Sequence, residues 1–156
     1  MTIINHECYI SLEVAKLLKK AGFDWERETC YIGKSGRPYK YHKFFNWNMP
    51  RKYFEKYGSD NLFHAFISQK KTNSFISAPT LEVAQRWLRE VKNCYVGVEE
   101  FVHNLDKNNI YYTYNWVVYL DGDRHSGSDY DNTHYYEVAL ETSIKKALEL
   151  ILEEGE

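Results

Sequence analysis

The 156-residue chain lacks most of the features that identify a chemistry or a compartment. It has three cysteines, an odd number with no Cys-x-x-Cys pair, so a reduced protein is expected. No apolar run approaches the length of a membrane span, and residues 1–20 lack the apolar core of a signal peptide. These absences predict a cytoplasmic protein that does not enter a membrane.

A nucleotide-binding loop is also missing, although Gly33-Lys34-Ser35 has the sequence that ends one. The first glycine of such a loop would stand at position 28, where the carboxylate of Glu28 would repel a phosphate. The residues after Gly36 have strand character and no helical period. The segment therefore predicts a turn between two short strands around Tyr31 and Tyr41.

The composition is that of a folded protein, with 44% hydrophobic and 27% charged residues. Its length fits one domain, residues 1–156. Aromatic residues reach 17%, including 14 tyrosines, which favours sheet, a contact surface, or both. The net charge of −2 is unevenly distributed: residues 29–78 hold nine Lys/Arg and two acids, and residues 121–156 hold three Lys/Arg and ten acids.

Three helices are predicted from apolar stripes and their end signals. The first spans about 11–21, with Ser11 as N-cap and Gly22 as its stop. The second follows Thr80, and the third runs from about Tyr136 to Glu154. The first two share the pattern Ser/Thr-Leu-Glu-Val-Ala, which indicates either convergence on good capping or a weak internal repeat of a helix and a hairpin.

A second hairpin is expected from residues 94–102 and 110–120, with its turn near Lys107 to Asn109. Strand alternation predicts that the even positions of its second strand face inward: Ile110, Tyr112, Tyr114, Trp116, Val118 and Leu120. The order of elements is then αββαββα. We expect an α+β domain with helices packed on one face of an antiparallel sheet. Residues 48–77 form a less regular insertion, in which a helix after Asn48 and a strand at Leu62–Ile67 are expected.

Basic and aromatic residues alternate between positions 37 and 57. Cations neutralise phosphates and aromatic rings stack on bases, so this mixture is typical of a single-stranded nucleic-acid groove. Core aromatics and edge lysines explain the same pattern without a ligand. The candidate surface for nucleic acid or a protein partner consists of Arg37, Tyr39, Lys40, Tyr41, Lys43, Trp47, Arg51 and Lys52.

No catalytic, metal or cofactor site is predicted. The acidic segment 121–134 departs from the calcium-loop pattern at Ser126 and Asn132, and its two histidines fit no zinc spacing, so a solvated connection is expected there. Cys30 and Cys94 are expected to face the interior as small hydrophobes. An enzyme whose site gathers His and carboxylate groups from separate elements stays an alternative.

The motifs ISLEVAKLLKKAGFD, FNWN, SAPTLEVAQRWLREVKN and YYEVALETSIKKALELI together resemble a group of small uncharacterised proteins of Bacteroides-type gut bacteria and their phages and prophages. The most specific part is Ala78-Pro79-Thr80 followed by Trp87-Leu88-Arg89-Glu90. That group has no established activity, so the resemblance implies a cytoplasmic, mobile-element accessory protein and transfers no site residue.

The leading expectation is a non-enzymatic binding protein without a cofactor, whose partner is another protein or a second copy of the chain. Tyrosine and tryptophan would anchor the contact, and the uneven charge would orient it. The alternative is a nucleic-acid-binding accessory protein that uses residues 37–57.

Overall fold

The computed structural model describes residues 2–3, 9–57, 74–128 and 135–155, which divide into two compact units, Met1–Pro79 and Thr80–Glu156. Helices and antiparallel strand pairs occur in both units, which confirms the α+β class. The strands form two sheets rather than the single sheet expected. The single domain at 1–156 and the internal repeat stay predictions.

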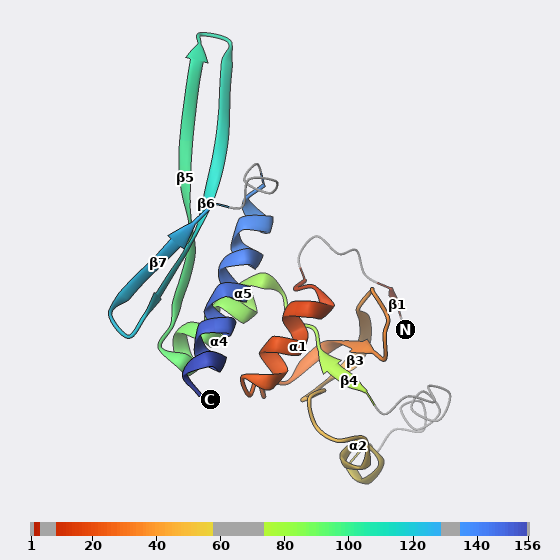
Figure 1. Ribbon diagram of the computed structural model, residues 1–156. Coiled ribbons are helices and arrows are strands. Elements are labelled where there is room, and N and C mark those ends of the chain that lie inside the picture. Colours follow the sequence, from red (N-terminus) through yellow and green to blue (C-terminus); the bar gives the residue numbers. More distant parts are fainter. Residues whose placement is uncertain (1, 4–8, 58–73, 129–134, 156) are drawn as a thin grey trace. The chain divides into compact units, whose positions relative to one another are not determined.

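The first unit contains a four-stranded antiparallel sheet in the order β1-β3-β2-β4 (Figure 1). Its elements are β1 (Thr2–Ile3), α1 (Leu12–Lys20), β2 (Arg27–Ile32), β3 (Tyr39–Phe45), α2 (Arg51–Tyr57) and β4 (Phe75–Ser77). The turn expected in place of a nucleotide loop is confirmed, since β2 and β3 form a hairpin and Gly33 has a φ of 60°. The expected short helix after Asn48 is α2, whereas Leu62–Ile67 lies outside the described residues.

The predicted ends of α1 are confirmed. The Ser11 side chain accepts a hydrogen bond from the amide of Val14, as an N-cap does. Gly22 has a φ of 94°, a conformation that glycine adopts without strain. The next amide, of Phe23, donates to the carbonyl of Leu18 and turns the chain back toward the helix.

Strand β2 lies between β3 and β4, and its last four residues are buried, so both faces of the sheet are covered here. Cys30 and Ile32 belong to a cluster that also contains Tyr41, Trp47, Phe54 and Phe75. Tyr31 points to the opposite face by strand alternation, and its hydroxyl donates to the carbonyl of Ile10 at 2.7 Å. The predicted burial of Cys30 is therefore confirmed.

The second unit contains a three-stranded antiparallel sheet in the order β5-β6-β7, and α5 packs on β5 and β6 (Figure 1). Its elements are α4 (Leu81–Lys92), β5 (Tyr95–Asp106), β6 (Asn109–Leu120), β7 (Asp123–Gly127) and α5 (Tyr136–Glu154). The buried hydroxyl of Ser143 donates to the carbonyl of Val117 and ties α5 to β6. Thr80 caps α4 as predicted, and Cys94 is buried as predicted.

Strand β7 corrects the expectation of a solvated connection at 121–134 over its first part, whereas residues 129–134 lie outside those the structure describes. Asp121 and Gly122 both have positive φ, 51° and 88°, as the two central residues of a tight hairpin turn require. They join β6 to β7, in which Leu120 lies opposite Asp123. Asp121 and Asp123 thus belong to a turn and an edge strand, and both side chains are exposed to solvent.

The predicted inward face of β6 is correct only near the end of the strand. Val118 and Leu120 are buried, but Ile110 and Tyr112 are exposed, at 53% and 47%. The physical reason is the length of the hairpin, which extends past the N-terminal end of α5 (Figure 1). A strand keeps its alternation beyond the helix that covers it, and the same face then meets solvent.

Candidate functional site

The eight residues of the predicted surface all belong to the first unit, and they do not form one surface. Arg37, Lys40, Lys43 and Lys52 are exposed, and Tyr39 is half-buried. Tyr41 and Trp47 lie in the core at 7% and 0% exposure. Arg51 is the first residue of α2, and its side chain lies outside those the structure describes.

The alternation of β3 separates the basic and aromatic residues of this segment. The aromatic cluster contains Tyr41, and Tyr39 and Phe45 pack against it. By strand alternation, Lys40 points to the other side. The indole of Trp47 donates to the carbonyl of Arg27 at 2.7 Å, so this ring is fixed inside the unit. Stacking of a base on Tyr41 or Trp47 would require the unit to open.

The ammonium of Lys40 is paired as well. Its Nζ lies 2.8 Å from a carboxylate oxygen of Glu28 on the neighbouring strand. The hydrogen bond and charge of Glu28 raise the pKa of Lys40 above its ordinary value. The pair lowers the net positive charge that this part of β3 offers to a phosphate.

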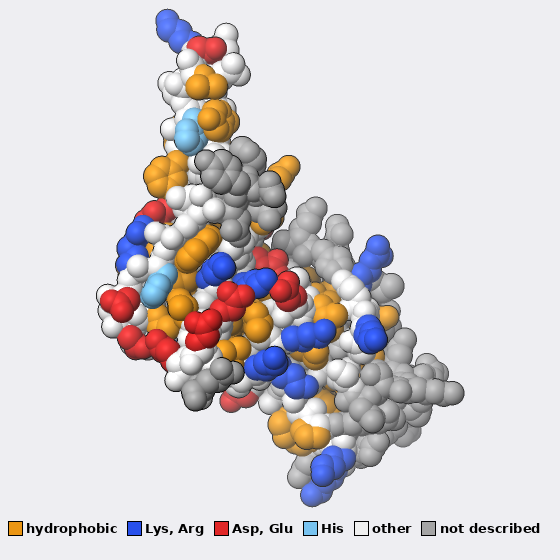
Figure 2. Space-filling model, in the orientation of Figure 1, with side chains coloured by type: hydrophobic (Ala, Val, Ile, Leu, Met, Phe, Trp, Pro, Cys, Tyr) orange, Lys and Arg blue, Asp and Glu red, His pale blue; other side chains and the backbone are white. Residues whose placement is uncertain are grey.

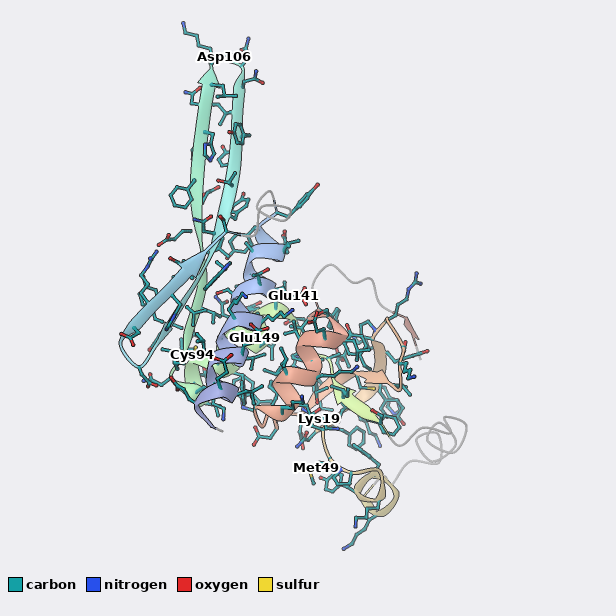
Figure 3. The ribbon with its side chains drawn as sticks, in the orientation of Figure 1. Lys19, Met49, Cys94, Asp106, Glu141 and Glu149 are labelled. Carbon is teal, nitrogen blue, oxygen red and sulfur yellow. The ribbon has the colours of Figure 1, made fainter. Side chains whose placement is uncertain are left out.

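The sequence reasoning missed an exposed apolar feature of the described residues, the end of the β5–β6 hairpin, which we call the arm (residues 101–113). Figure 2 shows hydrophobic side chains along this projection below a charged tip, and Figure 3 places Asp106 at the tip. Six large hydrophobic side chains of the arm are exposed: Phe101, Val102, Leu105, Ile110, Tyr111 and Tyr112.

Both faces of the arm carry apolar groups. Residues opposite each other in the ladder share a face, so Val102 and Tyr112 lie on the face that α5 covers further down the strand. Phe101 lies on the other face, with Tyr111 two positions further along. The signal that could have shown this exposure is the length of the two strands. Each has 12 residues, and a single helix covers only part of that length.

The helix α5 marks where coverage ends. The ring of Tyr136, the first residue of α5, meets Tyr114 edge-on at 5.9 Å between centroids. Further along α5 and β6, the ammonium of Lys146 lies 5.9 Å from the ring centroid of Trp116. Beyond Tyr114 no described helix lies on this face, so Tyr112 and Ile110 are open to a partner.

A polar network fixes the base of the arm on the face opposite α5. The guanidinium of Arg124 in β7 pairs with Glu99 of β5 and also donates to Tyr119 and Ser126. The network joins all three strands where the two-stranded arm begins.

Within the arm, the side chain of His103 in β5 contacts two residues of β6. Its imidazole stacks on Tyr111, with 4.6 Å between centroids and 8° between planes. Its Nε2 also lies 2.8 Å from the hydroxyl oxygen of Thr113. These contacts order one face of the arm and leave the edge of Tyr111 exposed.

The described residues give little support for a metal site or for a catalytic cysteine. No three His, Cys, Asp or Glu side chains gather there closely enough to hold a metal ion. Burial raises the pKa of the Cys30 thiol, and burial with nearby carboxylates raises that of Cys94 to about 11, so neither thiol is activated as a nucleophile. None of the described helices has the length and apolar composition needed to cross a membrane.

No protein-family model, curated protein or solved structure matches the chain. The resemblance to proteins of gut bacteria and phages therefore stays a prediction.

Proposed function

We propose that this chain is a non-enzymatic binding protein and that the arm is its contact element for a protein partner. The observation that carries the proposal is the set of six exposed hydrophobic side chains on one two-stranded projection. Clustered apolar exposure of this kind is uncommon on a monomer and is typical of an interaction site. A two-stranded ribbon is also only marginally stable in water until further strands or a helix pack on it.

The charge of the second unit favours a protein over a nucleic acid at the arm. Thr80–Glu156 contains seven Lys/Arg and fifteen Asp/Glu, which gives a net charge of −8. Met1–Pro79 contains thirteen Lys/Arg and seven Asp/Glu, which gives +6. The two values add to the −2 of the whole chain. The arm itself carries Asp106 and Lys107 as its acidic and basic residues, and Glu99 and Glu100 precede it. A phosphate backbone would be repelled by this unit.

The first test removes apolar atoms from one face of the arm through Val102→Thr, Ile110→Thr and Tyr112→Thr. A matched control, Phe44→Thr, Val91→Thr and Tyr95→Thr, changes three side chains that are as exposed, at 54%, 50% and 53%. We expect the arm variant to bind a partner at least about tenfold more weakly than wild type, because buried aromatic and aliphatic anchors dominate such contacts. The control variant should bind like wild type.

Partners are to be isolated on the immobilised full chain, identified by mass spectrometry, purified and titrated against the three proteins. Self-association of each protein is measured alongside. The proposal is wrong if no purified partner, the chain's own copy included, distinguishes the arm variant from the control.

The net +6 of the first unit supports a second candidate function, nucleic-acid binding through exposed Arg37, Lys40 and Lys43. If this function holds, changing these three residues to Gln weakens binding of single-stranded DNA of every sequence and reduces the salt slope by about 2. The control changes three other exposed cations, Lys16 and Lys20 of the first unit and Arg89 of the second. Fluorescence titrations at several salt concentrations measure both; equal affinities of the two variants would remove the candidate.

A further inference from the structure

The two edges of the arm differ in charge. The edge of β5 carries Glu99 and Glu100 immediately before the arm and Asp106 at its tip, and acidic side chains along an edge oppose pairing with another strand. At its base this edge is also occupied, because the side-chain amide of Gln85 in α4 donates to the carbonyl of Val96 at 2.8 Å. β5 is therefore protected against strand addition.

The other edge of the arm, residues 109–115 of β6, has no such protection. β7 pairs with β6 only at Trp116–Leu120, and on this edge, away from β5, no described strand lies beside residues 109–115. The segment reads Asn-Ile-Tyr-Tyr-Thr-Tyr-Asn, without a charge, a proline or a glycine. A strand edge rich in Tyr, Ile and Thr and free of charge is a ready template for another strand.

We propose that a second copy of this chain pairs with this edge, so that the two β6 strands run antiparallel about a two-fold axis at Tyr112. The inference rests on the proposed function and names the partner at the arm. An antiparallel arrangement is what a two-fold axis between identical edges produces. The pairing joins two two-stranded arms into one four-stranded sheet, β5-β6 of one protomer and β6-β5 of the other.

The segment is complementary to itself in this register. Pairing about position 112 places Asn109 opposite Asn115, Ile110 opposite Tyr114, Tyr111 opposite Thr113 and Tyr112 opposite its own copy. Aromatic–aromatic and aromatic–β-branched pairs are among those that stabilise antiparallel ladders. No pair brings two charges together, and the seven positions add about six to eight backbone hydrogen bonds, since every second pair exchanges two.

The register also fits the neighbouring strand. Gly127, the last residue of β7, lies opposite Trp116, and the paired segment begins at the next residue, Asn115. The second copy's strand would run in the same direction as β7 along the same edge of β6, and would continue where β7 ends. The pairs of the second copy and those of β7 would thus use different residues of β6.

The test uses two variants of the full chain that differ in a single side chain. Tyr111→Lys with Thr113→Lys places lysine opposite lysine twice in the proposed dimer. Tyr111→Lys with Thr113→Glu places lysine opposite glutamate twice at the same positions. Both variants lose the contacts of His103 with Tyr111 and Thr113, so the effect of losing these contacts is shared, and thermal unfolding compares the stability of the two variants.

Sedimentation equilibrium over a wide concentration range measures the dimer dissociation constant, and thermal unfolding checks that both variants fold. We expect a wild-type dimer that is weakened about 30-fold by the two lysines and stays within about threefold of wild type with lysine and glutamate. Equal weakening in both variants would overturn the proposed register. A monomeric wild type would overturn the second copy as partner, and the proposed function would still stand if a different purified protein binds through the arm.

Discussion

Replacing Trp47 by alanine is expected to destabilise the first unit by about 3–5 kcal/mol, the cost of removing a buried aromatic side chain and leaving a cavity. The indole is fully buried. It stacks on Phe54 at 5.5 Å and meets Phe45 and Phe75 at 5.3 and 6.0 Å between centroids. The substitution also leaves the carbonyl of Arg27 without its indole donor.

Trp47→Phe is the matched control, because it keeps an aromatic ring in the cluster and removes the indole N–H. We expect it to cost roughly 1–3 kcal/mol, the penalty for a partly buried carbonyl that loses its donor together with a small change in packing. Urea unfolding followed by far-UV circular dichroism measures both variants. A cost below about 1 kcal/mol for the alanine variant would contradict the buried position of the ring.

The Trp47 result also bears on nucleic-acid binding. A ring held in the core cannot stack on a base while the unit is folded, so a fluorescence change on adding DNA would have to come from another tryptophan. Trp25 and Trp116 are partly exposed in the first and second units. Such a change would place the contact near one of them and not at the aromatic cluster.

The helices and the turns could be predicted because their signals are local. Ser11, Thr80 and Gly22 act through hydrogen bonds or backbone angles within a few residues, and each is found in its predicted role. The hairpin turn at Asp121-Gly122 has an equally local signal, but the acidic residues around it led to the prediction of a solvated connection instead. The short strands β4 and β7 are too brief to show a period of their own.

The candidate surface was harder to predict, because exposure depends on what packs on an element. In β3 the alternation already separates Tyr41 from Lys40, and the sequence could have shown that the aromatic rings and the cations point apart. In β6 the alternation is continuous from Ile110 to Leu120, yet only the end covered by α5 is buried. Where a helix stops along a strand is a tertiary property that neither segment shows alone.

Shortening the arm should abolish association and leave the second unit folded. The variant replaces residues 102–112 by Asn-Gly, so that Phe101 and Thr113, which lie opposite each other, flank a two-residue turn. The six residues Val102, Asn104, Leu105, Ile110, Tyr111 and Tyr112 are exposed and contribute little to the core of the unit. The anchoring contacts at the base, of Arg124 with Glu99 and of Ser143 with Val117, are retained.

We expect the free energy of unfolding of the second unit to change by no more than about 1 kcal/mol, as for other substitutions of exposed residues. The proposed dimer should weaken on the order of 100-fold or more, because the shortened variant removes Asn109–Tyr112, most of the β6 edge that pairs with the second copy. Chemical unfolding and sedimentation measure the two effects separately. A control that keeps the arm and changes only the turn, Lys107→Asn with Asn108→Gly, should associate like wild type.

The two measurements together distinguish an arm that binds from an arm that stabilises its own unit. If the shortened chain unfolds far more easily, residues 102–112 are part of the fold, and their exposed side chains need another explanation. If it folds and still dimerises, the contact lies elsewhere. A folded monomer is the result expected when a projection carries apolar groups that its own unit does not bury, because such groups are stabilised only by a partner.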